Sequence, residues 1–178
     1  FDNLPKEVTV FEVGPRDGLQ NESKHIETAD KVALIEAIAQ AGLKQIEVTS
    51  FVSPKWIPQL ADGAQVIASL SLPADLSISA LVPNLKGYEA AKASGLKQIN
   101  LFLSASEAHS KKNINKSVAE AISTMKEVAD VALQDGMRLR CYVSTVFACP
   151  YEGPVSINSV LKVVEGLVSM GVHEISLG

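Results

Sequence analysis

An arginine and an aspartate stand side by side at Arg16 and Asp17, directly after a β-type run expected at 7–13. A carboxylate in that position can ligate a hard cation such as Mg²⁺ or Mn²⁺. A guanidinium can stabilise a developing oxyanion. The alternative is a loop ion pair or two turn residues, and the spacing alone leaves both interpretations open. Gln20 follows in the same loop and by itself is typical of a solvated position.

Glu47 is a second candidate because it lies inside a short apolar run at 45–51. A carboxylate within a strand is costly to bury unless it has a partner. One interpretation is functional, with Glu47 orienting Arg16 or handling a proton. The other is structural, with Glu47 paired to a lysine. We favour the functional interpretation, and Glu12 is a similar but weaker candidate.

Other polar residues follow later strands, and their simplest interpretations are structural. Asn84 is expected to cap the next helix rather than to reach a substrate. Residues 104–113 are expected to form a long polar loop, in which Lys111 and Lys112 face solvent rather than an anion. Cys149 is expected to be a structural thiol, because no neighbouring base is visible in the sequence. The three histidines are isolated and form no metal-binding pair.

These residues must be positioned by a repeating pattern of helix, glycine and short apolar run. Gly42, Gly95 and Gly171 each follow a stretch of helical periodicity, and Gly136 marks a looser copy. Glycine there is typical of a helix carboxyl terminus, where the backbone often takes a positive φ. The apolar run after each glycine predicts a buried parallel strand.

The pattern predicts six strands alternating with five helices. We expect the strands near 7–13, 44–50, 76–82, 97–103, 138–144 and 172–177, and the helices near 29–41, 60–70, 86–94, 117–134 and 157–169. Thr28 is expected to cap the first helix, and Ser117 with Glu120 to form a capping box on the fourth.

This alternation indicates an α/β protein with a parallel sheet covered by helices. The two candidate architectures are an open doubly wound sheet and a TIM (β/α)₈ barrel. The glycine-rich phosphate turn of the first is absent after the first strand, so we favour the barrel. A barrel needs eight strands and typically ~250 residues. We therefore interpret residues 1–178 as a single incomplete TIM-barrel domain with about the first six strands, whose chemistry belongs at the strands' carboxyl ends.

Composition excludes several classes of protein. The chain has 178 residues, a formal net charge of −4 and 47% hydrophobic residues, which argues against disorder and against a basic nucleic-acid-binding module. No apolar run reaches the ~18 residues of a membrane span. Residues 1–5 lack the features of a signal peptide, and an initiator methionine is absent. Two cysteines form no disulfide framework, so we expect a reducing, cytoplasmic location.

Six segments in order along the chain resemble the 3-hydroxy-3-methylglutaryl-CoA (HMG-CoA) lyase family. The strongest is the first-strand signature Glu-Val-Gly-Pro-Arg-Asp-Gly-Leu-Gln-Asn-Glu at 12–22. The others lie at 49–56, 83–87, 111–115, 149–153 and 174–178. The wider family, with isopropylmalate and homocitrate synthases, shares the Arg-Asp-Gly core but not the remaining motifs.

The resemblance implies a TIM-barrel carbon–carbon lyase that needs a divalent cation, Mg²⁺ or Mn²⁺, and acts on an acyl-CoA substrate. The reaction would cleave HMG-CoA to acetyl-CoA and acetoacetate. By position, Asp17 matches the metal carboxylate, and Arg16 matches the residue that contacts substrate and stabilises the enolate. Glu47 matches the catalytic glutamate beside that arginine. Gln20 matches a substrate-binding residue at the same end of the barrel.

The same resemblance sets limits on what this chain does alone. The family's other metal ligands, a His-x-His pair and an asparagine, and its catalytic cysteine lie on later strands and are not in this chain, and Cys149 belongs to a different motif. We therefore expect these 178 residues alone to be inactive, and the full-length protein to be a homodimer. The alternatives are a lyase for a longer branched acyl-CoA, a condensing synthase, or a non-catalytic acyl-CoA-binding fragment.

Overall fold

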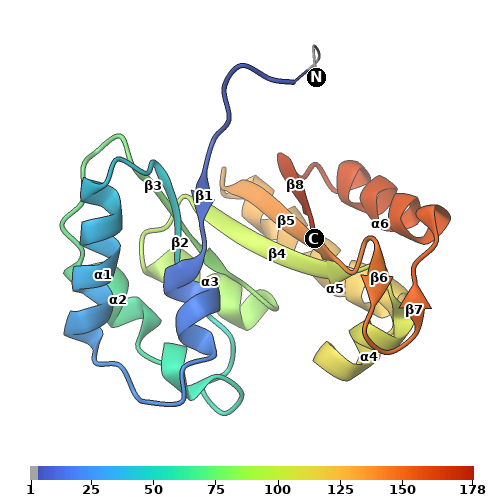
Figure 1. The fold of residues 1–178 in the computed structure, drawn as a ribbon, viewed down its shortest axis with the longest axis horizontal. Helices are drawn as coiled ribbons and strands as arrows, with labels where there is room; N and C mark the ends of the chain where they lie inside the picture. Colours follow the sequence, from blue (N-terminus) through green and yellow to red (C-terminus); the bar gives the residue numbers. More distant parts are fainter. Residues whose placement is uncertain (1–3) are drawn as a thin grey trace.

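A computed structural model describes residues 4–178 of the chain (Figure 1). Residues 1–3, on which the expected lack of a signal peptide partly rests, lie outside the described residues. Within the described part, no helix is both long and apolar enough to cross a membrane.

Six parallel strands form one curved sheet in the order β1-β2-β3-β4-β5-β8. These strands are β1 (Phe11–Glu12), β2 (Gln45–Ser50), β3 (Ser77–Leu81), β4 (Gln98–Ser104), β5 (Arg138–Ser144) and β8 (Glu174–Leu177). Because each strand pairs with its predecessor in the repeat, the sheet is part of a TIM barrel, as predicted. In residues 4–178, β1 and β8 are the two edges, so the barrel is open between them.

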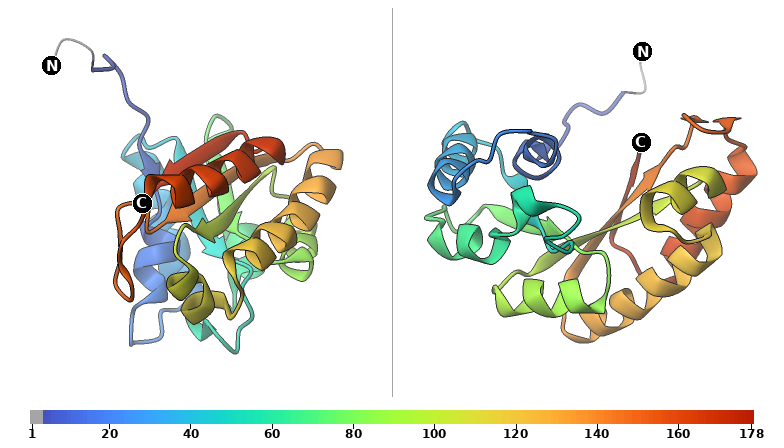
Figure 2. Two further views of the ribbon diagram at one scale, coloured as in Figure 1. Left: turned by 90° about the vertical axis from the view of Figure 1, so that its right-hand side faces the viewer. Right: turned by 90° about the horizontal axis from the view of Figure 1, so that it is seen from below.

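The helices lie on the outer, convex side of this sheet (Figure 2). They are α1 (Thr28–Gln40), α2 (Gly63–Ser69), α3 (Leu85–Ala93), α4 (Glu107–Ile114), α5 (Val118–Gln134) and α6 (Ile157–Ser169). Two short helical turns, η1 (Gly14–Gly18) and η2 (Pro58–Leu60), lie in the connections that follow β1 and β2.

Apolar side chains between the sheet and the helices form the core. The main cluster joins β3, β4 and β5 to α3, α5 and α6, with Ile99, Leu139 and Val128 wholly buried. A smaller cluster around Ile35 and Ile46 joins α1 to β2. Burial of this kind stabilises by roughly 1.5–3 kcal/mol for each large aliphatic side chain. The rigid sheet that results fixes the interior-facing polar residues described below.

The expected helix ends and caps are largely confirmed. Gly42, Gly95, Gly136 and Gly171 all have a positive φ, between 73° and 96°. The Ser117 capping box is present at the start of α5.

Three expectations about local structure are wrong, and one hairpin was not predicted. The first strand is only Phe11–Glu12, and the segment before it does not pair with β2 and exposes Val8 and Val10. The expected polar loop at 104–113 contains α4, capped by Ser106. A two-stranded hairpin, β6 (Ala148–Cys149) with β7 (Gly153–Pro154), was not expected. Thr28 is the first residue of α1 rather than its cap, and its hydroxyl donates to Asp62.

Candidate active site

A cleft of about 820 Å³ opens at the carboxyl ends of the strands. Its wall includes Arg16, Asp17 and Gln20 on one side and His109 and Lys112 from α4 on the other. A smaller cavity of about 370 Å³ adjoins it and shares Gln20 and the exposed Trp56. The polar residues that the sequence singled out around Arg16 therefore line one cleft, at the end of the barrel where chemistry is expected.

The turn η1 directs Arg16 and Asp17 into this cleft. The backbone N–H groups of both residues donate to the carbonyl of Val13, at 3.0 and 2.7 Å. Glu12 accepts from the backbone of Gly14 at 2.6 Å, which fixes the start of the turn. A side chain at Gly14 would place its Cβ 2.8 Å from that carboxylate oxygen, so it would displace the Glu12 side chain from this hydrogen bond.

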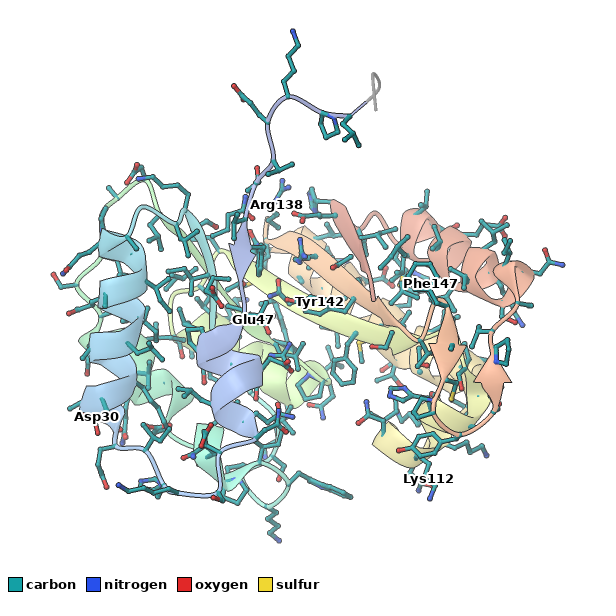
Figure 3. The ribbon with its side chains drawn as sticks, in the orientation of Figure 1. Asp30, Glu47, Lys112, Arg138, Tyr142 and Phe147 are labelled. Carbon is teal, nitrogen blue, oxygen red and sulfur yellow. The ribbon has the colours of Figure 1, made fainter. Side chains whose placement is uncertain are left out.

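Glu47 lies behind Arg16, where three side chains donate hydrogen bonds to its carboxylate. Arg16 Nε donates to Oε1, while Asn100 Nδ2 and the Tyr142 hydroxyl both donate to Oε2, the hydroxyl at 3.0 Å. Glu47 and Tyr142 face each other near the middle of the sheet (Figure 3). All three groups are donors, which matches the acceptor oxygens of the Glu47 side chain.

The side chains of this network become progressively less exposed from the cleft inward. The exposed fractions are 58% for Asp17, 11% for Arg16 and 0% for Glu47. Arg16 Nη1 donates to Asp17 at 2.6 Å, and within residues 4–178 Arg16 Nη2 has no hydrogen-bond partner. Two carboxylates therefore hold the guanidinium from two sides and leave one nitrogen for a ligand.

The electrostatics of the pocket keep Arg16 charged and Tyr142 neutral. Burial opposes the charge on Arg16, but Glu47 and then Asp17 outweigh it and raise its pKa above the ordinary value. Burial, followed by the nearby Glu47 carboxylate, also raises the pKa of Tyr142 above its usual range. Tyr142 is thus a hydrogen-bond donor to Glu47 at neutral pH.

Residues 4–178 do not by themselves form a complete site for the divalent cation that the family resemblance implies. Within the described residues, no three His, Cys, Asp or Glu side chains lie close enough together to hold a metal ion. Asp17 contributes one exposed carboxylate at the cleft. Gln20 lies beside it, and its buried Oε1 atom has no hydrogen-bond partner in residues 4–178.

The remaining candidates have mostly local structural contacts. Asn84 caps α3 by accepting from the backbone of Gly87 at 3.0 Å, as predicted. Lys112 lies 5.5 Å from the centre of the Tyr151 ring. Cys149 is buried and accepts from Ser106 at 3.0 Å. Burial acts against ionisation of this thiol, but hydrogen bonds from the Ser106 hydroxyl and from the backbone of Tyr151 and Glu152 lower its pKa.

Sequence reasoning missed Asn100 and Tyr142, which hold Glu47 from β4 and β5. It also missed Arg140, which lies over the Phe11 and Tyr142 rings and pairs with Glu174. The available signal was alternation, because these polar residues recur at every second position of strands that are otherwise apolar.

The comparisons with known proteins agree with this geometry. Residues 7–178 match the family described as HMGL-like. A 3-hydroxy-3-isohexenylglutaryl-CoA/hydroxy-methylglutaryl-CoA lyase from Pseudomonas aeruginosa is 49% identical over 99% of this chain and 59% of its own length. A hydroxymethylglutaryl-CoA lyase from Bacillus subtilis is 47% identical over 98% of this chain and 58% of its length.

Solved structures show the same similarity. The crystal structure of hydroxymethylglutaryl-CoA lyase from Pseudomonas aeruginosa has a TM-score of 0.96, with 99% of this chain and 59% of that chain covered. An HMG-CoA lyase from Acinetobacter baumannii in complex with coenzyme A and 3-methylmalate has a TM-score of 0.90 at 38% identity, with 95% and 55% covered. This chain therefore spans a little over half the length of these relatives.

The fold and the cleft define a TIM-barrel protein of the type whose polar groups gather at the carboxyl ends of the strands. Within that class, the chain belongs to the HMGL-like family, and its relatives across nearly its whole length are HMG-CoA lyases.

Proposed function

We propose that this chain supplies part of the active site of a divalent-metal-dependent lyase that cleaves HMG-CoA to acetyl-CoA and acetoacetate. The observation that carries the proposal is the Arg16–Glu47 pair, which holds a charged guanidinium at the cleft of a protein whose relatives are HMG-CoA lyases. Arg16 follows β1 at the carboxyl end of the sheet, which is where barrel enzymes hold their catalytic groups.

Arg16 would stabilise the charge that the reaction creates. In the retro-Claisen cleavage the C3 hydroxyl loses its proton and becomes the ketone of acetoacetate. The C2–C3 bond breaks, its electron pair forms the enolate of acetyl-CoA, and that enolate then takes up a proton. A fixed cationic donor beside the enolate oxygen is worth ~3 kcal/mol in the transition state. The free Nη2 of Arg16 is suited to this contact.

Glu47 would orient Arg16 rather than transfer a proton. Its carboxylate is 0% exposed and lies behind the guanidinium, so a substrate in the cleft meets Arg16 first. Gln20 would bind the substrate, because it lines the cleft and carries an unpaired buried amide oxygen.

Asp17 would be one ligand of the divalent cation, Mg²⁺ or Mn²⁺, with further ligands from outside these residues. When bound, such a cation makes the loss of the substrate hydroxyl proton easier. The exposed carboxylate of Asp17 beside the cleft supports this role.

The partners follow from the same proposal. An acyl-CoA substrate is supported by the Acinetobacter baumannii structure, which holds coenzyme A. A homodimer of the full-length protein and a cytoplasmic location remain predictions; for the latter, the support is that both cysteines are free. The net charge of −4 argues against nucleic acid as a partner.

Product analysis tests the proposal. The protein to assay is the longest natural form that contains these residues, called the full chain below. It is incubated with HMG-CoA and Mg²⁺, and acetyl-CoA and acetoacetate are quantified. We expect equal amounts of both products, loss of turnover with EDTA, and loss of metal activation in Asp17→Asn. The 178 residues alone are expected to be inactive. Preferential cleavage of a longer branched substrate would favour the related acyl-CoA lyase, and binding without any metal effect would favour a non-catalytic fragment.

A further inference from the structure

We infer that Asn100 is a positioning residue for the proposed lyase reaction, acting through Glu47 to hold the guanidinium of Arg16 in the cleft. The inference deepens the proposed function and rests on it. Asn100 lies on β4, is wholly buried and is not among the residues that line the cleft.

The geometry gives Asn100 a defined task. Its Nδ2 atom donates both to Glu47 Oε2 and to the hydroxyl of Ser79, at 2.9 Å from the latter. The opposite oxygen of Glu47 accepts from Arg16 Nε. The Glu47 carboxylate is therefore held between Asn100 on its inner side and Arg16 on its outer side. The position of the Arg16 guanidinium thus depends on the hydrogen bond that Asn100 donates.

The orientation of the Asn100 amide follows from the charges around it. A flipped amide would place Oδ1 against the Glu47 carboxylate, which is an acceptor only. In the present orientation Oδ1 is buried without a partner in the described residues. Leaving a buried acceptor unpaired costs free energy. That cost falls here on the residue whose amide nitrogen donates to Glu47. A purely structural asparagine would be expected to satisfy both ends of its amide.

Gln98 provides an internal control on the same strand. It is two residues before Asn100, is 4% exposed, and accepts from the Ser77 hydroxyl of β3 at 3.3 Å, whereas Asn100 donates to Ser79. Both amides face the barrel interior because side chains alternate along a strand. Among the described residues, Gln98 has no carboxylate partner. Substitutions at Gln98 and Asn100 therefore disturb similar packing, but only those at Asn100 reach Arg16.

The first test is a double-mutant cycle on turnover, measured in the full chain with HMG-CoA and Mg²⁺. Asn100→Ala is expected to lower kcat about 10- to 100-fold, the range for a lost hydrogen bond to a charged group, with little change in KM. In a Glu47→Gln background the same substitution should lower kcat less than about 3-fold. Gln98→Ala should have the same small effect in both backgrounds. Equal losses for Asn100→Ala in both backgrounds would overturn the inference.

The second test uses the nearly isosteric Asn100→Asp and its control Gln98→Glu, so that the result does not depend on Asn100→Ala folding. Two adjacent carboxyl groups at 47 and 100 would share one proton, and the protonated one can still donate to the other. The charged and titratable groups facing them are Arg16, Tyr142 and Arg140.

Relative to wild type, Asn100→Asp should keep activity at low pH and lose about 10-fold as the shared proton leaves with rising pH. Gln98→Glu should add no such pH dependence. Identical pH profiles for the two variants would contradict the inference. An inactive wild type would instead reject the proposed function, so the two failures are distinguishable.

Discussion

Replacing Arg16 with methionine would remove the positive partner of a wholly buried carboxylate. Glu47 is 0% exposed and would keep two neutral donors, Asn100 and Tyr142, but no ion-pair partner among residues 4–178. Breaking a buried ion pair from one side typically costs about 3–5 kcal/mol. Because two donors remain, we expect the free energy of unfolding to fall by about 3 kcal/mol, the lower end of that range.

Urea unfolding followed by circular dichroism measures this change. Trp56, the only tryptophan, is 81% exposed and therefore a poor fluorescence probe of unfolding. With a urea dependence of about 2 kcal/mol per molar, the midpoint should fall by about 1.5 M. The control Arg138→Met removes a half-exposed guanidinium 3.7 Å from Glu174 and should cost less than about 1 kcal/mol. Equal midpoints for the two variants would refute a buried Arg16–Glu47 pair.

Three further predictions concern other parts of the chain. Burial acts to raise the pKa of Asp62, but hydrogen bonds from Lys31 and Thr28 outweigh it and lower that pKa. The ionised carboxylate therefore stabilises the fold above pH ~4, and this stability is lost as the pH falls below that value. In urea titrations, Asp62→Asn should reduce the loss of stability at acid pH. Burial raises the pKa of the Cys141 thiol, so iodoacetamide should alkylate Cys149 first in the folded protein, as peptide mass analysis would show. Ser117→Ala should cost about 1 kcal/mol in urea unfolding by removing a helix cap.

The sequence predicts the barrel architecture because local rules and the global fold agree there. A glycine with a positive φ follows α1, α3, α5 and α6, and the apolar run after it has only the sheet to bury it, as with Gly95 before β4. The helix α4 escaped prediction because Glu107–Ile114 is mostly polar and shows no apolar stripe. Its one available signal was the cap at Ser106. Strand β1 is shorter than predicted because Val8 and Val10 lack a surface to bury them in residues 4–178.

The site was predictable only where its residues are adjacent in sequence or fall within a recognisable motif. Arg16 and Asp17 are neighbours on one turn, and a buried Glu47 needs a partner, so their proximity to each other could be argued in advance. Asn100 and Tyr142 approach Glu47 from strands 53 and 95 residues away. Only the register between strands brings them together, and sequence spacing carries no direct record of that register.

The proposed function depends most on Arg16 acting at the cleft, and turnover of HMG-CoA by the full chain measures this directly. With Mg²⁺ present, Arg16→Gln should lower kcat by about 100-fold or more, as expected for loss of a fixed donor to an enolate oxygen. Arg138→Gln changes a half-exposed arginine at the amino end of β5, away from the cleft at the strands' carboxyl ends. It should leave kcat within about 3-fold of wild type. A kcat for Arg16→Gln as high as that of Arg138→Gln would contradict the account.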